Sequence, residues 1–352
     1  MTVSRLNWRI PLVSSRKVSF LALTTLYVLA GDGGLPGIRL FTATPAAGLT
    51  ASGATAAAVI AGAPRGDDDD FALDPMAPVR AAAPGDDSEI AYSEVNFRDT
   101  SFVVSNLHLD WVTRREPHVM ASLHDAVQGR AKGAECFVLD VGMNDGFFSV
   151  MAAKLGCRVV SFELQEKCIR IARRAFDING VDHLVRIVHR PASSEEGVTM
   201  VLPYDSNYCS GTFGFANRDC GEHCNPNFPT TRAFLSVALG GRFGGSGAAE
   251  IDWLKVDVEG LDPSVLAGAL PLFRRRLVRI AMVEIDSGTW LAAVRANITQ
   301  DNWVVFEIMS FGYSLQCLTS PNRFSSTSPR AEVLRFIYSG SCIDYELKRA
   351  QK

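Results

Sequence analysis

The chain has 352 residues, enough for one large domain or two small ones, and 47% of them are hydrophobic, an ordinary fraction for a globular protein. Its formal net charge of -3 and its pI near 6.1 argue against general nucleic-acid binding, which usually requires a basic face. No stretch approaches the roughly 18 continuous apolar residues of an unambiguous membrane span.

Residues 1–30 predict a targeting segment. Residues 1–17 contain basic side chains and no acid, and residues 18–30 are apolar or uncharged. This order is typical of a secretory signal, either cleaved after Ala30 or kept as a signal anchor that tethers the chain to a membrane through residues 18–30. Because the segment is also rich in Ser, Thr and Arg, an organelle transit peptide is the alternative. We expect a lumenal or Golgi-type location.

Residues 31–90 predict a flexible linker. They are dominated by Ala, Gly, Pro and Thr, and have too few large apolar side chains to offset the entropy of ordering the chain. The acid run Asp67–Asp70 is interpreted as a solvated charge block, with a metal site as the weaker alternative. The folded domain is then expected over residues 91–345.

That domain opens with an extended segment and a helix. Residues 96–109 suggest a short strand or an extended lead-in. Residues 117–128 predict a helix, because Pro117 suits its first position, Gly129 suits its end, and the apolar side chains lie on one face.

A glycine-bearing turn follows the next apolar run. Residues 137–141 predict a buried parallel strand, and a helix is expected from the end of the turn to Leu155. Glycine lets the backbone approach a ligand closely, and Asp140 ends the strand where open α/β sheets bind ligands. The turn is not the dinucleotide pattern G-x-G-x-x-G, since Asn144 replaces the middle glycine, and no P-loop Gly-Lys-Ser/Thr follows.

A second strand is expected over residues 158–162. Glu163 closes it about 20 residues after the glycine turn, the spacing of a βαβ nucleoside site. Its carboxylate can accept hydrogen bonds from both hydroxyls of a ribose, although an acid at a strand end can also be simply solvated.

The rest of the chain predicts alternating helices and strands, hence an α/β fold. Helices are expected over 165–179, over 299–310 and from Pro263, and strands over 184–188, 198–202, 251–256, 278–285, 313–318 and 333–338. The last two strands are expected to form an antiparallel pair, and the polar tail from Asp344 is expected to fray.

Three acids at predicted strand ends are candidate catalytic residues. Asp257 and Glu259 follow the strand over 251–256, and Glu284 lies at the end of the strand over 278–285. A carboxylate at a strand end could act as a general base. These acids could also bind sugar hydroxyls or a divalent cation, or Glu259 could merely shape the turn; no metal site is assigned.

The eight cysteines leave alternatives open. Cys209, Cys220 and Cys224, with His223, lie in the irregular segment 203–247, where a disulfide, free thiols and a zinc site are all possible. The three cysteines in or beside predicted buried elements, Cys136, Cys157 and Cys168, are expected to be core thiols. Cys317 and Cys342 could pair, and Asn297 lies in a glycosylation sequon.

These motifs resemble the FkbM family of S-adenosylmethionine-dependent methyltransferases. The family's first motif, Asp-x-Gly-x-Asn-x-Gly, is matched by Asp140, Gly142, Asn144 and Gly146, and its Asp-Val-Glu-Gly motif by Asp257 to Gly260. The resemblance implies a Rossmann-like class I methyltransferase fold, with a seven-stranded, mostly parallel sheet whose last strand is antiparallel. It also implies S-adenosyl-L-methionine as cofactor, held by the first motif and Glu163, with residues 190–193, including Ala192, beside the adenine.

We therefore expect an S-adenosylmethionine-dependent O-methyltransferase. The resemblance implies a hydroxyl acceptor on a small molecule, carbohydrate or glycan, lined by the three strand-end acids. A nicotinamide-dependent oxidoreductase and a non-catalytic, membrane-tethered binding protein on the same scaffold are the alternatives. Asn144 and the Asp-Val-Glu-Gly segment argue against the oxidoreductase.

Overall fold

The structure is a computed structural model that describes residues 89–130, 134–204, 209, 230–245, 247–285 and 303–350. The predicted targeting segment and nearly all of the predicted linker lie outside these residues, as do Cys220, Cys224 and the sequon at Asn297. The chain divides into two compact units, and every described residue belongs to the second, residues 67–352. Within the described residues, no helix combines the length and apolar character needed to cross a membrane.

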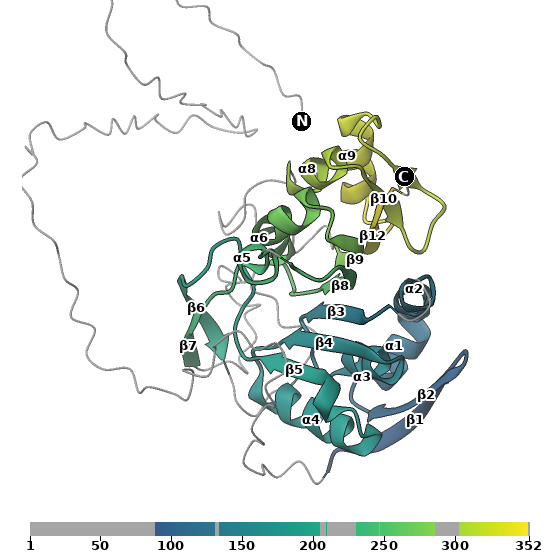
Figure 1. Ribbon diagram of the computed structural model, residues 1–352, viewed down its shortest axis with the longest axis vertical. Helices are drawn as coiled ribbons and strands as arrows, with labels where there is room; N and C mark the ends of the chain where they lie inside the picture. Colours follow the sequence, from purple (N-terminus) through teal and green to yellow (C-terminus); the bar gives the residue numbers. More distant parts are fainter. Residues whose placement is uncertain are drawn as a thin grey trace, which may run out of the picture. The chain divides into compact units, whose positions relative to one another are not determined.

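The described part of the chain is built on an eight-stranded sheet in the order β11-β10-β12-β9-β8-β3-β4-β5 (Figure 1). Its strands are β3 (Cys136–Val141), β4 (Cys157–Phe162), β5 (Val185–Val188), β8 (Ile251–Val256), β9 (Val278–Glu284), β10 (Tyr313–Cys317), β11 (Arg323–Phe324) and β12 (Asp344–Arg349). The pairs from β9 through β8, β3 and β4 to β5 are parallel, whereas β12 runs antiparallel to both β9 and β10. Every residue of β3 and β8 is buried, as expected for parallel strands covered on both faces. The predicted mostly parallel sheet with an antiparallel last strand is therefore confirmed.

The far end of the sheet differs from the prediction. Residues 333–338 belong to helix α9 (Arg330–Tyr338), and the last strand is β12, where a frayed tail was expected. In α9 the buried side chains Val333 and Ile337 are four residues apart, a helical spacing. In β12 the buried side chains Tyr345 and Leu347 alternate with polar ones, a strand spacing. The two-residue strand β11 makes eight strands where seven were expected.

Helices cover both faces of the sheet (Figure 1). One face carries α2 (Pro117–Gln128), α3 (Phe147–Lys154) and α4 (Glu166–Asn179); the other carries α5 (Leu239–Phe243), α6 (Asp262–Arg274), α8 (Trp303–Ser310) and α9. The helix predicted over residues 117–128 is found with these bounds. The short helix α1 (Leu109–Arg115) precedes α2.

Two small hairpins accompany the main sheet. The segment expected as an extended lead-in is the antiparallel pair β1 (Tyr92–Phe97) and β2 (Thr100–Ser105), and β2 packs on α3 and α4. Strands β6 (Thr199–Tyr204) and β7 (Thr230–Leu235) form the second antiparallel pair. A turn of 3-10 helix, Asp182–Leu184, leads into β5.

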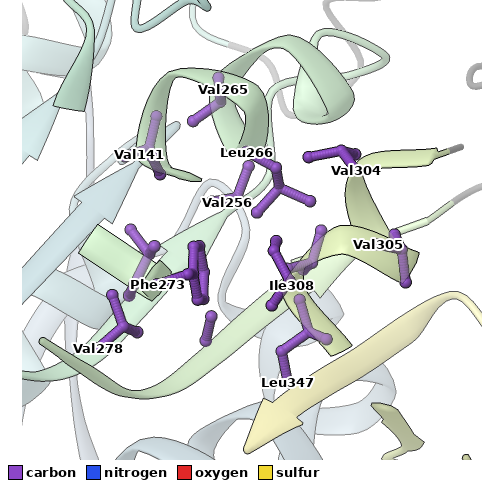
Figure 2. Close-up of a cluster of buried hydrophobic side chains, with 14 of the residues drawn as sticks. Val141, Val256, Val265, Leu266, Phe273, Val278, Val304, Val305, Ile308 and Leu347 are labelled. Atoms are coloured by element: carbon purple, nitrogen blue, oxygen red, sulfur yellow. The ribbon is translucent and has the colours of Figure 1, made fainter. Parts of the chain in front are cut away.

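The core on the face of α6 and α8 holds the strand ends in place. Figure 2 shows Val141 of β3 and Val256 of β8 packed with Val265 and Leu266 of α6, and Ile308 of α8 in the same cluster. Each of these side chains is at most 1% exposed, and burying one such side chain contributes about 1.5–3 kcal/mol. The carboxyl ends of β3 and β8, where the predicted site residues lie, are therefore anchored in this buried core.

Candidate functional site

A pocket opens at the carboxyl ends of β3, β4 and β8, the edge at which open α/β sheets bind ligands. The empty space in this pocket is about 620 Å³, including the part open to solvent. The lining residues come from the glycine turn, the end of β4, the segment after β5 and the turn after β8: Val141, Gly142, Asn144, Phe162, Glu163, Leu164, Gln165, Arg190, Pro191, Ala192, Asp257, Val258, Glu259 and Leu261. Six of the predicted cofactor residues and acids thus meet at one place: Gly142, Asn144, Glu163, Ala192, Asp257 and Glu259.

The turn after β3 is held against its neighbouring strands. The N–H groups of Gly142 and Met143 both donate to the carbonyl of Phe162, at 3.0 and 2.9 Å. Gly142 has a φ of +83°, and a Cβ at this position would lie 1.7 Å from the carbonyl oxygen of Asp257. Glycine is therefore required here both by the backbone conformation and by the approach of the turn after β8.

Gly146 also has a structural role. Its φ is +89°, and a Cβ there would lie 2.7 Å from the Cβ of Ala172 in α4. Gly146 does not line the pocket; it begins α3 and lets α3 and α4 approach closely. The glycine of the motif at this position thus serves the packing of two helices.

Glu163 is buried at the end of β4 and receives three backbone hydrogen bonds. Its Oε2 accepts from the N–H of Asn144 at 2.7 Å, and its Oε1 accepts from Leu164 and Gln165 at 2.7 and 2.8 Å. Burial raises the pKa of Glu163, and these N–H groups oppose that shift by stabilising the carboxylate. The side chain of Gln165 also donates to this carboxylate, so a ligand hydroxyl would share an acceptor oxygen with one of these groups.

Asp140 lies beneath the turn rather than in the pocket wall. It is 1% exposed, and its Oδ2 accepts a hydrogen bond from Ser149 at 2.6 Å. Its other oxygen, Oδ1, has no hydrogen-bond partner among the described residues. Burial raises the pKa of Asp140, and the ammonium of Lys255 counteracts this.

Lys255, which the sequence analysis did not single out, joins the two motifs. It is 3% exposed, and its Nζ donates to the Gly142 carbonyl at 3.0 Å and to the Asp257 carboxylate at 2.8 Å. Burial disfavours the charge, but Asp257 and Asp140 outweigh it and raise the pKa of Lys255. A lysine two residues before Asp257, in a strand that is mostly apolar, is the sequence signal that could have identified it.

The three predicted catalytic acids lie together. Asp257, Glu259 and Glu284 can each place one carboxylate oxygen within 4.8 Å of the others. Burial, followed by the charges of neighbouring acids, strongly raises the pKa of Glu284. Carboxylates this close can share a proton, accept hydrogen bonds from hydroxyl groups or bind a cation together. Glu284 does not line the pocket itself.

Asp262 shapes the turn that carries two of these acids. Its carboxylate accepts hydrogen bonds from the N–H groups of Val258 and Gly260, at 3.0 and 2.9 Å. Glu259, between them, has a φ of +54°, which is uncommon for a residue with a side chain. Burial and the charge of Asp257 raise the pKa of Asp262 to about 7.

Glu116, at the junction of α1 and α2, is a further acid near this site that the sequence did not reveal. Its Oε1 accepts a hydrogen bond from the indole N–H of Trp111 at 2.6 Å. Burial raises its pKa, and the negative charge of Asp257 adds to the shift. No local pattern marks Glu116, because its proximity to Asp257 depends on the packing of α2 against the sheet.

The described cysteines form three disulfides. Cys136 pairs with Cys157, Cys168 with Cys209, and Cys317 with Cys342. The expectation of core thiols at Cys136, Cys157 and Cys168 is therefore wrong. Cys136 and Cys157 face each other at the start of adjacent strands, and Cys168 is reached from a distant segment. The suggested pairing of Cys317 with Cys342 is confirmed.

Comparison with known proteins identifies the domain. Residues 140–296 match the family model described as "Methyltransferase FkbM domain". Among solved structures, the methyltransferase FkbM from Methylobacillus flagellatus KT is 11% identical, with a TM-score of 0.34, over 68% of this chain and 60% of that one. The O-methyltransferase TomG from Streptomyces achromogenes, solved in complex with SAM, is 15% identical, with a TM-score of 0.29, over 66% of this chain and 78% of that one.

WbdD in its monomeric form is 12% identical, with a TM-score of 0.33, over 69% of this chain and 44% of that one. This chain thus spans less than two thirds of both WbdD and the Methylobacillus protein. The strand order of the sheet and the two sequence motifs agree with the family match. Residues 140–296 therefore match the methyltransferase FkbM domain.

Proposed function

We propose that the protein is an S-adenosylmethionine-dependent O-methyltransferase whose acceptor is a hydroxyl of a carbohydrate or glycan. The observation that carries this proposal is the pocket in which Glu163, held by three backbone N–H groups, faces the same hollow as Gly142 and Asp257. The methyltransferase FkbM domain supplies the reaction class.

The pocket fits each part of this cofactor. Glu163 is placed to accept hydrogen bonds from the ribose hydroxyls, with Ala192 and Leu261 as apolar walls for the adenine. Gly142 and Asp257 line the part of the pocket that we assign to the methionine part. Asp140 offers a buried oxygen without a partner among the described residues, and the surplus of carboxylates suits the positive charges of the sulfonium and the amino group.

When bound, S-adenosylmethionine supplies an electrophilic methyl group; the new bond joins that carbon to the acceptor oxygen as the bond from carbon to sulfur breaks. The acceptor hydroxyl must also lose its proton. Asp257 and Glu259 line the pocket, and Glu284 lies next to them. We assign these three acids to the side of the pocket that holds the acceptor. There its members hold the hydroxyl in place, and one of them takes the proton.

Lys255 is assigned a positioning role rather than that of the base. The neighbouring carboxylates raise its pKa, so the ammonium stays protonated at neutral pH and cannot accept a proton. Its two hydrogen bonds fix the position of the Gly142 carbonyl relative to the Asp257 carboxylate. Lys255 thus connects the cofactor half of the pocket to the acceptor half.

We further propose that the protein works in an oxidising compartment, as the basic and apolar leader suggests. All six described cysteines are in disulfides, a state that persists in the secretory pathway and outside the cell and is rare in the cytosol. Mass spectrometry of the protein purified without reductant tests this directly. Free thiols at these six positions would contradict it.

Calorimetric titration of the full chain with S-adenosylmethionine, and separately with NADH, tests the cofactor. We expect micromolar affinity for S-adenosylmethionine that Asp140→Ala and Glu163→Ala both weaken, and no binding of NADH. A folded, monodisperse protein that does not bind S-adenosylmethionine would refute the proposal. Positive titration would then justify a screen of glycans for transfer of a labelled methyl group, with small phenols and carboxylic acids as competing acceptor classes.

A further inference from the structure

One of the three disulfides lies against the cofactor turn. Cys168, in the first turn of α4, is fully buried and pairs with Cys209, which follows β6; the two Cα atoms are 4.9 Å apart. The Sγ atoms of Cys168 and Cys209 lie 3.2 and 3.3 Å from Oδ1 of Asn144. Because a disulfide carries no thiol proton, these are packing contacts, and they place Oδ1 of Asn144 directly against the bond between the two sulfur atoms.

Asn144 connects this disulfide to the proposed ribose site. Its backbone has a φ of +54°, a conformation that a residue with a side chain adopts only with support from its surroundings. In that conformation its N–H donates to Oε2 of Glu163 at 2.7 Å. The chain of contacts therefore runs from the disulfide, through the side chain and backbone of Asn144, to the Glu163 carboxylate.

The other two disulfides are placed differently. Cys136 and Cys157 begin β3 and β4, so they lie at the amino ends of strands whose carboxyl ends form the pocket. Cys317 ends β10 and Cys342 precedes β12 at the other end of the sheet. They provide natural controls for the general effect of removing a disulfide.

We propose that the Cys168–Cys209 disulfide is a positioning element of the cofactor site: it holds Asn144 so that its N–H orients Glu163. The identity of the ligand in this inference rests on the proposed function, whereas the contact between the disulfide and the turn does not. Loss of the disulfide loosens the turn over residues 142–146 and lowers cofactor affinity. Loss of a structural disulfide elsewhere lowers stability without loosening this turn or lowering cofactor affinity.

The test compares Cys168→Ser/Cys209→Ser with the control Cys317→Ser/Cys342→Ser, both in the full chain and without ligand. Hydrogen exchange measured by mass spectrometry reports on peptides that cover residues 140–150. We expect faster exchange of these peptides in the first variant only, although both variants unfold at lower temperature than the wild type. Unchanged exchange there, or an equal increase in the control, would overturn the proposal.

Affinity for S-adenosylmethionine, measured by calorimetry on the same proteins, is the second readout. We expect the affinity of the first variant to fall about tenfold, which is within the range of interaction energies between residues in direct contact. The affinity of the control should not change. If the wild type does not bind, the proposed function fails, and the exchange comparison still decides the role of the disulfide.

Asn144→Gly keeps the inference testable if the first variant does not fold. It removes the side chain that contacts the sulfurs and leaves the disulfide intact, and glycine adopts the required φ without strain. We expect the same faster exchange over residues 142–146 and a similar loss of affinity. An Asn144→Gly protein that exchanges and binds like the wild type would refute the proposal.

Discussion

Gly142→Ala and Gly156→Ala form a matched pair that tests how closely the two motifs of the site approach each other. The two glycines have nearly the same backbone conformation, with φ of +83° and +85°. A Cβ at Gly156 would meet nothing within 4 Å, whereas one at Gly142 would lie 1.7 Å from the Asp257 carbonyl oxygen. Both substitutions therefore place a side chain at a positive φ, but only Gly142→Ala also creates a steric clash.

The shared cost is that of placing a side chain in the left-handed region, roughly 1–2 kcal/mol. At Gly142 the added carbon must also move away from the Asp257 oxygen by about 1.6 Å, because ordinary contacts between carbon and oxygen begin near 3.3 Å. That displacement strains the hydrogen bond of 3.0 Å between the Asp257 N–H and the Val141 carbonyl. Adding about 1–3 kcal/mol for overpacking and about 1 kcal/mol for this bond gives a total of about 3–6 kcal/mol.

Urea unfolding of both variants measures this difference, and calorimetry with S-adenosylmethionine measures its effect on the site. We expect Gly156→Ala to lose about 1–2 kcal/mol of stability and to bind the cofactor like the wild type. Gly142→Ala should lose several kcal/mol and bind weakly or not at all. If the two variants unfold within about 0.5 kcal/mol of each other, the inferred close approach of the turns after β3 and β8 is wrong.

Three further predictions concern the charges of the site. Glu163→Gln should weaken S-adenosylmethionine binding about 10- to 100-fold, because the amide NH₂ cannot accept the Asn144 N–H; calorimetry showing wild-type affinity would contradict the ribose assignment. Lys255→Met should cost about 3–5 kcal/mol in urea unfolding, because it leaves buried acids without their counter-charge, and a neutral effect would show that solvent reaches them. Binding of the cationic cofactor at pH 7 should release protons. The pKa of Asp262 is raised to about 7 and that of Glu284 is also raised, so both acids can hold a proton before the cofactor binds. A positive charge nearby lowers both pKa values, and the protons then dissociate. Titration in buffers with different ionisation enthalpies measures this release, and proton uptake would refute the sign.

The sequence alone determined the parts of the fold that depend on local patterns. Continuous apolar runs identified β3, β8 and β9, and Pro117 and Gly129 bounded α2 correctly. The spacing of the two motifs also placed Asp140, Glu163 and Asp257 at the ends of strands that turned out to be neighbours. These inferences succeeded because strand order in a doubly wound sheet brings the ends of the first, second and fourth parallel strands to one edge.

The end of the chain shows where local patterns failed. Residues 333–338 are apolar enough for a strand, but Val333 and Ile337 bury one side of a helix against the core, and the polar residues from Asp344 form the antiparallel strand. Both segments mix polar and apolar residues, so their local sequences fit a helix or a strand. Packing against the rest of the protein decided between the two.

Only the tertiary structure decided which residues complete the site. Lys255 gains its role from two carboxylates on different strands, Glu116 from the packing of α2, and the Cys168–Cys209 pair from a segment 41 residues away in sequence. Gly146, part of the motif by sequence, belongs to the packing of α3 on α4. Motifs record residues that lie close together along the chain, whereas charge pairing, disulfide pairing and steric fit depend on distances in space.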